Sequence, residues 1–348
     1  MPIFSGIFFG IDLIRTCQVN GNGEMTALLK VRNLSTKLAT PRGLVTPVDN
    51  LSFDLEEGRT LALVGESGSG KTIACLSILG LLPANGRRVA GKILFADRDL
   101  MSLTDREMET VRGRELGMIL QDAMTSLNPL FTIGQQITEV FQRHYGIRDK
   151  SELRRRSIEV LESVGISAAH DRIHSYPFQL SGGMRQRISI AINIACSPRL
   201  LICDEPTTAL DATVQLQVLA LLQKVCREKK MAMIFITHNL HLARRVADEV
   251  AVMYAGRIVE QGSVADIFSR PAHPYTQGLL DAIPSLTTRL SRLQSIPGYA
   301  PSLLSIGKDC RFAPRCSKRY ERCASYPDWY ETRDARRRVA CWRAGENE

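Results

Sequence analysis

Three predominantly apolar runs lie along the chain, at 60–64 (TLALV), 200–203 (LLIC) and 231–237 (MAMIFIT). Runs of this kind are typical of parallel strands that are buried on both faces of a sheet. The first two runs are followed by segments with helical spacing, at 72–82 and 212–229. Strands that alternate with helices in this way predict an α/β domain built around a parallel sheet.

The pattern changes on either side of these runs. Segments at 28–34 and 48–55 predict two short strands, separated by a linker at 41–47 that contains Pro and Gly. Between about 123 and 190, charged runs and apolar positions at helical spacing predict a helical subdomain. Towards the C-terminus the composition shifts to Pro, Arg and Cys, so we expect a small appended domain over 263–348.

The composition of the 348 residues fits a soluble globular protein, with 44% hydrophobic and 23% charged residues. The length predicts about two domains, and no apolar stretch reaches the ~18 residues of a membrane span. The net charge of +9 is compatible with an anionic partner such as a nucleotide or a membrane surface. Residues 1–25 lack the basic start and cleavage site of a signal peptide. Because strand-like sequence begins directly after Met25, we interpret this leader as the result of a misassigned start.

A glycine-rich loop with the pattern G-x-x-x-x-G-K-T follows the first apolar run. Its glycines let backbone N–H groups turn inward around phosphate oxygens, and the following helix adds the positive end of its dipole. The lysine would reach the β- and γ-phosphates of a nucleoside triphosphate, and the threonine hydroxyl would ligate Mg²⁺. A structural turn is the plainer alternative, but the strand before the loop and the helix after it favour phosphate binding. The loop consists of Gly65, Glu66, Ser67, Gly68, Ser69, Gly70, Lys71 and Thr72.

The second apolar run is followed by Asp204 and Glu205, and the third by His238. The carboxyl ends of parallel strands meet at one edge of a sheet, so these side chains are expected beside the phosphate loop. There Asp204 would hold the metal ion, and Glu205 would orient and deprotonate the attacking water. His238 would face the γ-phosphate. A helix-capping acid and a structural histidine are the alternatives, and the phosphate loop upstream favours the catalytic interpretation.

The segment 180–187 (LSGGMRQR) resembles the signature sequence of ABC ATPases. In addition, Gln121 resembles the Q-loop glutamine, 209–211 (ALD) the D-loop, and His238 the switch histidine. The resemblance covers 26–262 and implies a P-loop NTPase fold with a RecA-like parallel sheet core, an antiparallel β subdomain and a helical signature subdomain. It also implies a catalytic and metal-binding role for Gln121. The residues that it assigns to the ATP of a second ATPase subunit are Ser181, Gly182, Gly183 and Asp211.

Three further motifs, 126–129 (SLNP), 273–276 (HPYT) and 310–316 (CRFAPRC), resemble the oligopeptide, dipeptide and nickel import ATPases. This resemblance implies a peripheral ATPase on the cytoplasmic face of the inner membrane, which powers peptide uptake through two permease subunits. It also implies a sister or identical ATPase subunit and, indirectly, an extracytoplasmic solute-binding protein. Import of nickel or another small solute, a soluble ABC ATPase outside transport, and a non-catalytic regulatory subunit are the alternatives. No nucleic-acid reader motif occurs, so we expect no nucleic-acid partner.

One position departs from the family pattern. The family usually stacks an aromatic residue on adenine near the end of the first strand, and the matching residue here is Leu38. Stacking on a base contributes about 1–3 kcal/mol in nucleic-acid complexes. We therefore expect weaker adenine discrimination, or an aromatic side chain supplied from elsewhere.

Near the C-terminus, Cys310, Cys316, Cys323 and Cys341 lie among many arginines. Their spacing matches neither the paired cysteines of zinc sites nor the ferredoxin runs. Some members of the resembled family carry a four-iron, four-sulfur cluster in this region, and free thiols, zinc and a disulfide are the alternatives. For the arginines we expect an ordinary solvated face, with contact to anionic lipid headgroups as the functional alternative.

Overall fold

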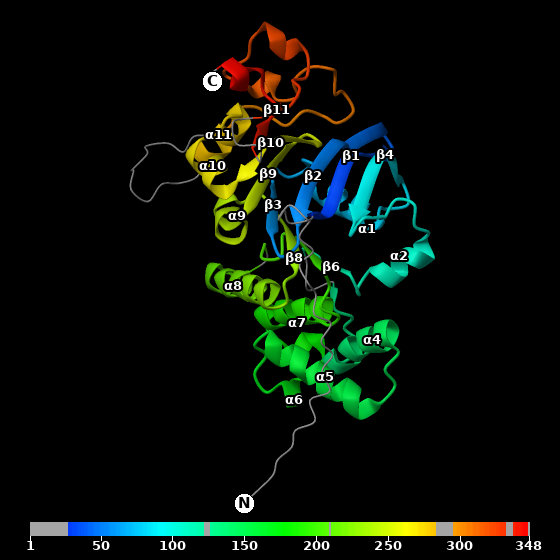
Figure 1. Cartoon of the computed structure of the whole chain (residues 1–348). Coiled ribbons are helices and arrows are strands. Elements are labelled where there is room, and N and C mark those ends of the chain that lie inside the picture. The colour runs from blue at the N-terminus through cyan, green and yellow to red at the C-terminus, as the bar shows by residue number, and fades with distance from the viewer. Residues whose placement is uncertain (1–26, 122–125, 209, 283–294, 332–336, 347–348) are drawn as a thin grey trace, which may run out of the picture.

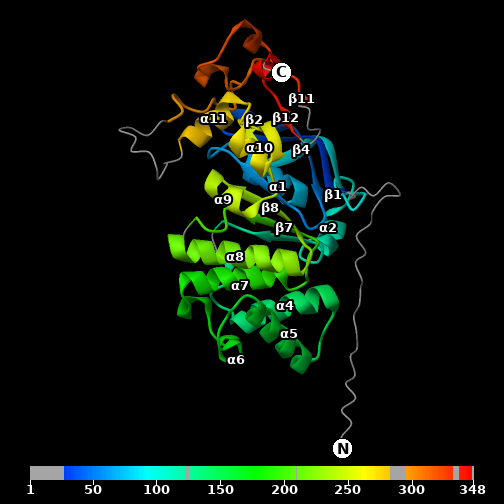
Figure 2. The same ribbon diagram turned by 60° about the vertical axis from the view of Figure 1, so that its left-hand side comes forward.

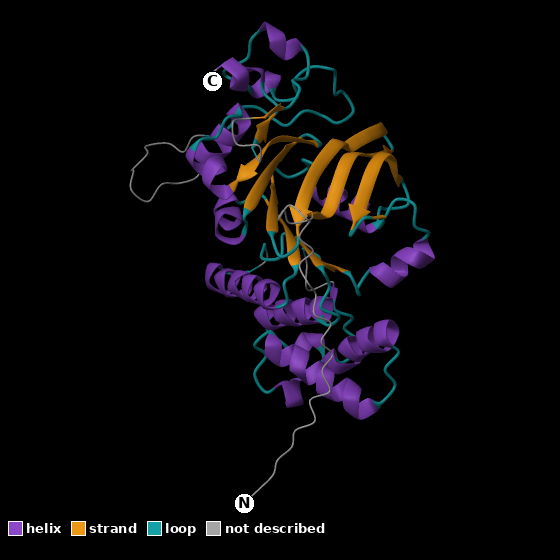
Figure 3. Cartoon of the chain, viewed as in Figure 1, coloured by secondary structure: helices purple, strands orange, loops and turns teal. Residues whose placement is uncertain are grey.

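The computed structural model describes residues 27–121, 126–208, 210–282, 295–331 and 337–346. Its core is an eight-stranded sheet in the order β11-β12-β10-β9-β3-β8-β7-β6 (Figure 3). Strands β6, β7, β8, β3 and β9 run parallel, whereas β10, β12 and β11 pair antiparallel. The bounds are β3 (Thr60–Val64), β6 (Leu116–Ile119), β7 (Leu200–Asp204), β8 (Ala232–Thr237), β9 (Glu249–Tyr254), β10 (Arg257–Ser263), β11 (Tyr330–Glu331) and β12 (Arg338–Val339).

Apolar packing covers both faces of the parallel strands. On β7, Leu201 and Cys203 join the cluster that includes α7 (Gly182–Ile194) and α8 (Ala212–Glu228). Leu200 and Ile202 point the other way and join residues of the second sheet. Successive strand residues alternate between faces, so a strand covered on both sides needs a continuous apolar run. The predicted parallel α/β core is confirmed.

The second sheet has four strands in the order β2-β1-β4-β5. The linker expected at 41–47 is wrong, because the two strands before and after it extend to a turn at 41–42, where Thr40 pairs with Gly43. The Thr40 hydroxyl donates to the Gly43 carbonyl at 2.7 Å, which closes this turn. The bounds are β1 (Ala27–Thr40), β2 (Gly43–Glu56), β4 (Gly86–Phe95) and β5 (Arg98–Asp99), and β4 was not among the strands expected from the pattern.

The helices lie along the core sheet and at one end of the molecule (Figure 1). Helices α4 to α7 gather at the end remote from the C-terminal segment, as a second view also shows (Figure 2). The predicted start of this helical subdomain, near 123, lies outside the described residues. Among the described helices, none combines the length and the apolar character needed to cross a membrane. The other helices are α1 (Lys71–Leu79), α2 (Asp105–Val111), α4 (Ile133–Tyr145), α5 (Lys150–Ser163), α6 (Ala169–Arg172), α9 (Leu240–Val246), α10 (Val264–Ser269) and α11 (Pro274–Asp281), with single turns η1 (Pro177–Gln179), η2 (Ala313–Arg315), η3 (Glu321–Ala324) and η4 (Trp342–Glu346).

The C-terminal segment is joined to the core sheet, because β12 pairs with β10. Several of its arginines are buried, which corrects the expectation of a solvated face. A buried guanidinium is costly unless a carboxylate neutralises it. The buried pairs are Arg311 with Asp49, Arg315 with Glu66, and Arg337 with Glu260.

Candidate nucleotide-binding site

The loop between β3 and α1 requires glycine at particular positions. Gly68 and Gly70 have φ angles of +79° and +104°, in the left-handed region that favours glycine. A Cβ atom on Gly70 would lie 2.0 Å from the carbonyl oxygen of Pro47. One on Gly65 would lie 2.1 Å from the carbonyl oxygen of Met253. The loop is therefore packed closely between β2 and β9.

Lys71, the first residue of α1, folds back over this loop and is only 5% exposed. Its Nζ atom donates to the carbonyl oxygens of Gly65 at 2.8 Å and Glu66 at 2.9 Å, and to Ser69 Oγ at 3.3 Å. Burial lowers the pKa of Lys71, while the nearby carboxylates of Glu205 and Asp204, at the end of β7, oppose that shift. The ammonium group thus sits where phosphate oxygens could replace neutral carbonyls as its partners.

Thr72 and Asp204 form the part of the site that suits a metal ion. Thr72 Oγ1 donates to Asp204 Oδ1 at 3.2 Å. Burial raises the pKa of Asp204, although the hydrogen bond from Thr72 counteracts it. Hydroxyl and carboxylate oxygens are ligands that Mg²⁺ prefers. Among the described residues, no three His, Cys, Asp or Glu side chains are grouped to hold a metal. Mg²⁺ in such sites is commonly held by one or two protein oxygens together with the phosphates of the substrate.

Glu205 is the centre of a small polar network. Its Oε1 lies 3.0 Å from His238 Nδ1, and its Oε2 accepts from Thr208 Oγ1 at 3.0 Å and from Gln121 Nε2 at 3.4 Å. Burial would raise the pKa of Glu205, but the hydrogen bonds from His238 and Thr208 outweigh it and lower the pKa. The carboxylate is therefore an anion at neutral pH and can accept a proton.

Most of these groups line one open cavity of about 750 Å³, whereas the predicted site residues Gly65, Ser69 and Asp204 lie behind its lining. Leu38 does not line it: the Leu38 side chain packs over Gly86, where a Cβ would lie 2.6 Å from Leu38 Cδ2. The apolar lining comes instead from Pro47, Ile73 and Leu279, and the last of these belongs to α11 and was not anticipated from the sequence. The predicted residues that line the cavity are Glu66, Ser67, Gly68, Gly70, Lys71, Thr72, Gln121, Glu205 and His238.

The signature residues lie elsewhere, at the N-terminal ends of two helices. Ser181 Oγ accepts from the Met184 N–H at 3.3 Å and caps α7. Asp211 Oδ1 accepts from two backbone N–H groups at the start of α8. Gly183 lies close to this second helix, since a Cβ on it would be 3.0 Å from Val214 Cγ1. The structure brings Ser181, Gly182, Gly183 and Asp211 to no part of the phosphate-loop cavity, and Ala209 of the D-loop lies outside the described residues.

The four C-terminal cysteines line one small enclosed cavity, together with Phe312, Tyr320 and Trp342. All four are free thiols, which removes the disulfide alternative. Burial raises the pKa of Cys310 to about 11. In the described part of the chain, no group of three or more His, Cys, Asp or Glu side chains is placed to hold a metal ion, and the iron–sulfur cluster stays a prediction.

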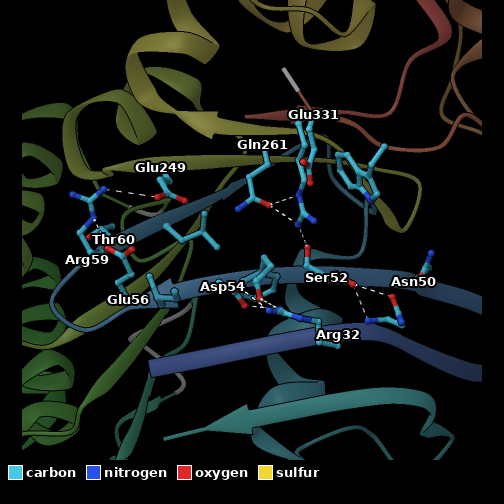
Figure 4. A pocket seen from close by; sticks show the side chains of 16 residues that line it. Arg32, Asn50, Ser52, Asp54, Glu56, Arg59, Thr60, Glu249, Gln261 and Glu331 are labelled. Carbon is cyan, nitrogen blue, oxygen red and sulfur yellow. Dashed lines mark hydrogen bonds and ion pairs between the residues drawn. The ribbon is translucent and has the colours of Figure 1, made fainter. Parts of the chain in front are cut away.

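A separate cavity of about 550 Å³ lies at the opposite end of β3 from the phosphate loop (Figure 4). Its charged side chains are largely paired with one another, as Arg32 is with Asp54. Arg338 of β12 donates to Gln261 at 2.8 Å, lies 4.5 Å from the centre of the Trp329 ring, and also donates to a carbonyl of β2. This cavity marks where the C-terminal segment ties the two sheets together, and none of the predicted site residues lines it.

A phosphate loop after a buried strand, with acids and a histidine at the ends of neighbouring parallel strands, defines a P-loop ATPase. The family model "ABC transporter" matches residues 48–208, and "Oligopeptide/dipeptide transporter, C-terminal region" matches residues 259–323. The chain belongs to the ATP-binding proteins of ABC transporters that carry this C-terminal region, as its motifs indicated. The fold also matches the dimeric ATP-binding cassette MJ0796, with a TM-score of 0.61 and 24% identity over 68% of this chain and 98% of that one.

Curated relatives support this assignment over nearly their whole length. The chain is 45% identical to the oligopeptide transport ATP-binding protein AppD of Bacillus subtilis, covering 91% of this chain and 97% of AppD. It is 44% identical to OppD of Escherichia coli, an oligopeptide transport ATP-binding protein, covering 93% and 95%. It is 44% identical to the dipeptide transport ATP-binding protein DppD of Bacillus subtilis, covering 91% and 95%.

Proposed function

We propose that this chain hydrolyses ATP to drive the import of oligopeptides or dipeptides through partner permease subunits. One observation carries the proposal: Lys71, Thr72 and Glu205 line a single cavity in a chain whose relatives are named for oligopeptide and dipeptide transport. The ATPase lies on the cytoplasmic face of the membrane, where cellular ATP is available to it.

In the proposed mechanism, Lys71 leaves the carbonyls of its own loop and donates to the β- and γ-phosphates of ATP. Thr72 and Asp204 would hold Mg²⁺, and this ion would supply positive charge to neutralise the transferring phosphoryl group. Glu205 accepts the proton of the attacking water, and Gln121 helps to orient that water and would also contact the metal ion. His238 lies 3.0 Å from Glu205 and holds this carboxylate in its ionised form.

We infer that each active site is completed by a second ATPase subunit, identical or sister. Ser181 caps the N-terminus of α7, a helix of 13 residues, and Asp211 caps that of α8, a helix of 17 residues. Neither residue lines the phosphate cavity of its own chain. The family resemblance implies that the anion at the positive end of α7 is the γ-phosphate held by the partner. Hydrolysis removes this bridge and lets the two subunits separate.

The permease contact is assigned to an exposed apolar surface on the helical subdomain. Leu130, Phe131, Tyr176 and Phe178 are 79%, 48%, 37% and 68% exposed. A backbone hydrogen bond of 2.9 Å joins the start of α4 to the segment before η1. This bond brings Leu130 and Phe131 close to Tyr176 and Phe178. Exposed aromatic clusters of this kind are typical of protein interfaces. The proposed occupant is a cytoplasmic segment of the permease.

Alanine at Phe178 or Leu130 should weaken co-purification of the permease subunits and uncouple ATP hydrolysis from uptake. Val89→Ala is the matched control, because Val89 is 43% exposed but lies on β4. Equal permease recovery from all three variants would remove this surface from the interface.

The solute is tested with the chain and its co-purifying permeases in sealed vesicles. ATP-dependent uptake of labelled di- and oligopeptides is the expected result. Uptake of nickel ions without uptake of peptides would overturn the peptide assignment while leaving the ATPase assignment intact.

For the C-terminal cysteines, the cavity that all four line supports a four-iron, four-sulfur cluster held by Cys310, Cys316, Cys323 and Cys341. Such a cluster would cross-link a segment that is poor in apolar residues. Protein purified without oxygen should then be brown and contain about four iron and four sulfide per chain. A colourless, iron-free sample would show that the thiols remain free.

A further inference from the structure

Arg315, in the turn between two of the C-terminal cysteines, reaches the phosphate loop. Its guanidinium donates to both carboxylate oxygens of Glu66, at 2.8 Å and 3.0 Å. The Arg315 side chain is 6% exposed and that of Glu66 is 30% exposed. A two-pronged arginine–carboxylate pair of this kind fixes orientation as well as charge.

The backbone of Glu66 is held as firmly as its side chain. Its N–H donates to the hydroxyl of Tyr275 at 3.0 Å, and its carbonyl accepts from Lys71 at 2.9 Å. Tyr275 is completely buried on α11, and its ring lies 4.6 Å from that of Tyr254. Two partners of Glu66, Tyr275 and Arg315, thus come from the C-terminal segment, and the third is the predicted phosphate-binding lysine.

A neighbouring arginine supports the same loop from the other side. Arg311 donates to the Ala255 carbonyl and pairs with Asp49 on β2. The next residue, Gly256, donates its N–H to the carbonyl of Ser69 in the phosphate loop at 2.9 Å. The C-terminal segment therefore contacts the loop directly through Arg315 and indirectly through the turn between β9 and β10.

We propose that Arg315 is a positioning residue for ATP binding: it fixes Glu66, and through Glu66 the backbone of the phosphate loop. This inference rests on the proposed ATPase function and deepens it. Glu66 lines the nucleotide cavity, so its displacement would shift the neighbouring loop carbonyls and N–H groups. A loop that is already ordered before ATP binds loses little further conformational freedom on binding, so the entropic cost of binding is smaller. The effect therefore falls on ATP affinity, whereas the groups that act on water are untouched.

The test compares steady-state ATP hydrolysis by the assembled transporter carrying Arg315→Met, Arg315→Lys or Glu66→Gln. Arg315→Met should raise the KM for ATP about ten-fold and leave kcat within about two-fold. Arg315→Lys keeps the charge but not the two-pronged geometry, so it should restore part of the affinity. The double variant Arg315→Met, Glu66→Gln should be no worse than either single variant, because both remove one interaction.

Two controls separate this role from general stability. Arg270→Met removes an arginine whose side chain is 72% exposed and which pairs with Asp266 on the same segment, away from the loop, and it should leave the KM unchanged. Tyr275→Phe removes only the acceptor of the Glu66 N–H, so it should raise the KM even where Arg315→Met does not fold. If Arg315→Met folds, an unchanged KM in that variant would overturn the inference. If it does not fold and Tyr275→Phe does, an unchanged KM in Tyr275→Phe would overturn it. Wild-type transporter that fails to hydrolyse ATP would instead overturn the proposed function.

Discussion

Replacing Glu205 by glutamine should stop turnover while the fold and ATP binding survive. The carboxylate accepts from Thr208 Oγ1 through one oxygen and faces His238 Nδ1 through the other, both at 3.0 Å. Glutamine keeps an oxygen for Thr208, and its NH₂ group can donate to His238 once the imidazole leaves Nδ1 unprotonated. We therefore expect the free energy of unfolding to change by less than about 1 kcal/mol.

The effect on the rate is much larger, because the amide cannot accept a proton from water. General-base catalysis typically contributes about 10²–10⁴-fold, which corresponds to about 3–5 kcal/mol of transition-state stabilisation. The pKa of Glu205 lies below its usual value, since the hydrogen bonds from His238 and Thr208 outweigh the effect of burial. The wild-type base is thus fully ionised at neutral pH, and the whole contribution is lost in the variant. Turnover should fall at least about 100-fold.

Phosphate release in Mg-ATP measures turnover, a fluorescent ATP analogue measures binding, and light scattering detects a dimer that stays closed. Glu109→Gln is the matched control, because its carboxylate is 57% exposed and pairs with Arg143 on the surface. Turnover by Glu205→Gln above about a tenth of the wild-type rate would refute the general-base assignment.

Three other predictions concern the loop and the response to acid. Lys71→Ala removes the ammonium group that Gly65 and Glu66 now hold, so equilibrium ATP binding should weaken at least about 100-fold; unchanged binding would contradict the phosphate-loop assignment. Gly70→Ala would place a Cβ 2.0 Å from a backbone oxygen, so both the Tm and ATP affinity should drop, and a variant with wild-type values of both would show that the loop has room. Burial lowers the pKa of His273 from 6.5 to about 3. Between pH 6.5 and pH 3, therefore, this histidine takes up its proton only in the unfolded chain. The contribution of this group to the free energy of unfolding is complete above pH 6.5 and falls by about 1.4 kcal/mol per pH unit below it. His273→Asn keeps an acceptor for the N–H at the start of α11, so urea denaturation should depend less on pH between 6.5 and 5, and an unaltered slope would count against this explanation.

The core of the site could be predicted because its geometry follows from local order along the chain. In a parallel sheet, residues that follow consecutive strands meet at one edge whatever the rest of the chain does. The phosphate loop after β3, Glu205 after β7 and His238 after β8 each follow a continuous apolar run, and all of them line the same cavity. The prediction of a second subunit came from the family motifs, because no periodicity in a single chain could indicate it.

Other parts of the structure could not be predicted from the pattern. Apolar and polar residues alternate only weakly along strand β4, since much of its surface is exposed. Its pairing with β1 joins residues that lie far apart in the sequence. The strands β1 and β2 continue through the Pro- and Gly-containing segment because antiparallel pairing satisfies the backbone there. The contribution of Leu279 to the cavity lining could not be predicted, because it depends on where α11 lies. That position is fixed by contacts between residues far apart in the sequence.

The arginines of the C-terminal segment show most clearly why composition was insufficient. A charged residue is exposed unless a specific partner offsets its desolvation, and composition says nothing about partners. Arg315 finds its partner 249 residues earlier in the chain, and Arg311 finds one 262 residues earlier. Both partners lie within or beside the segment that matches the ABC transporter model, whereas both arginines lie in the segment that matches the C-terminal model. Neither segment alone would therefore bury these charges in pairs, and separating the two should destabilise the phosphate loop before it affects the strands that carry Glu205 and His238.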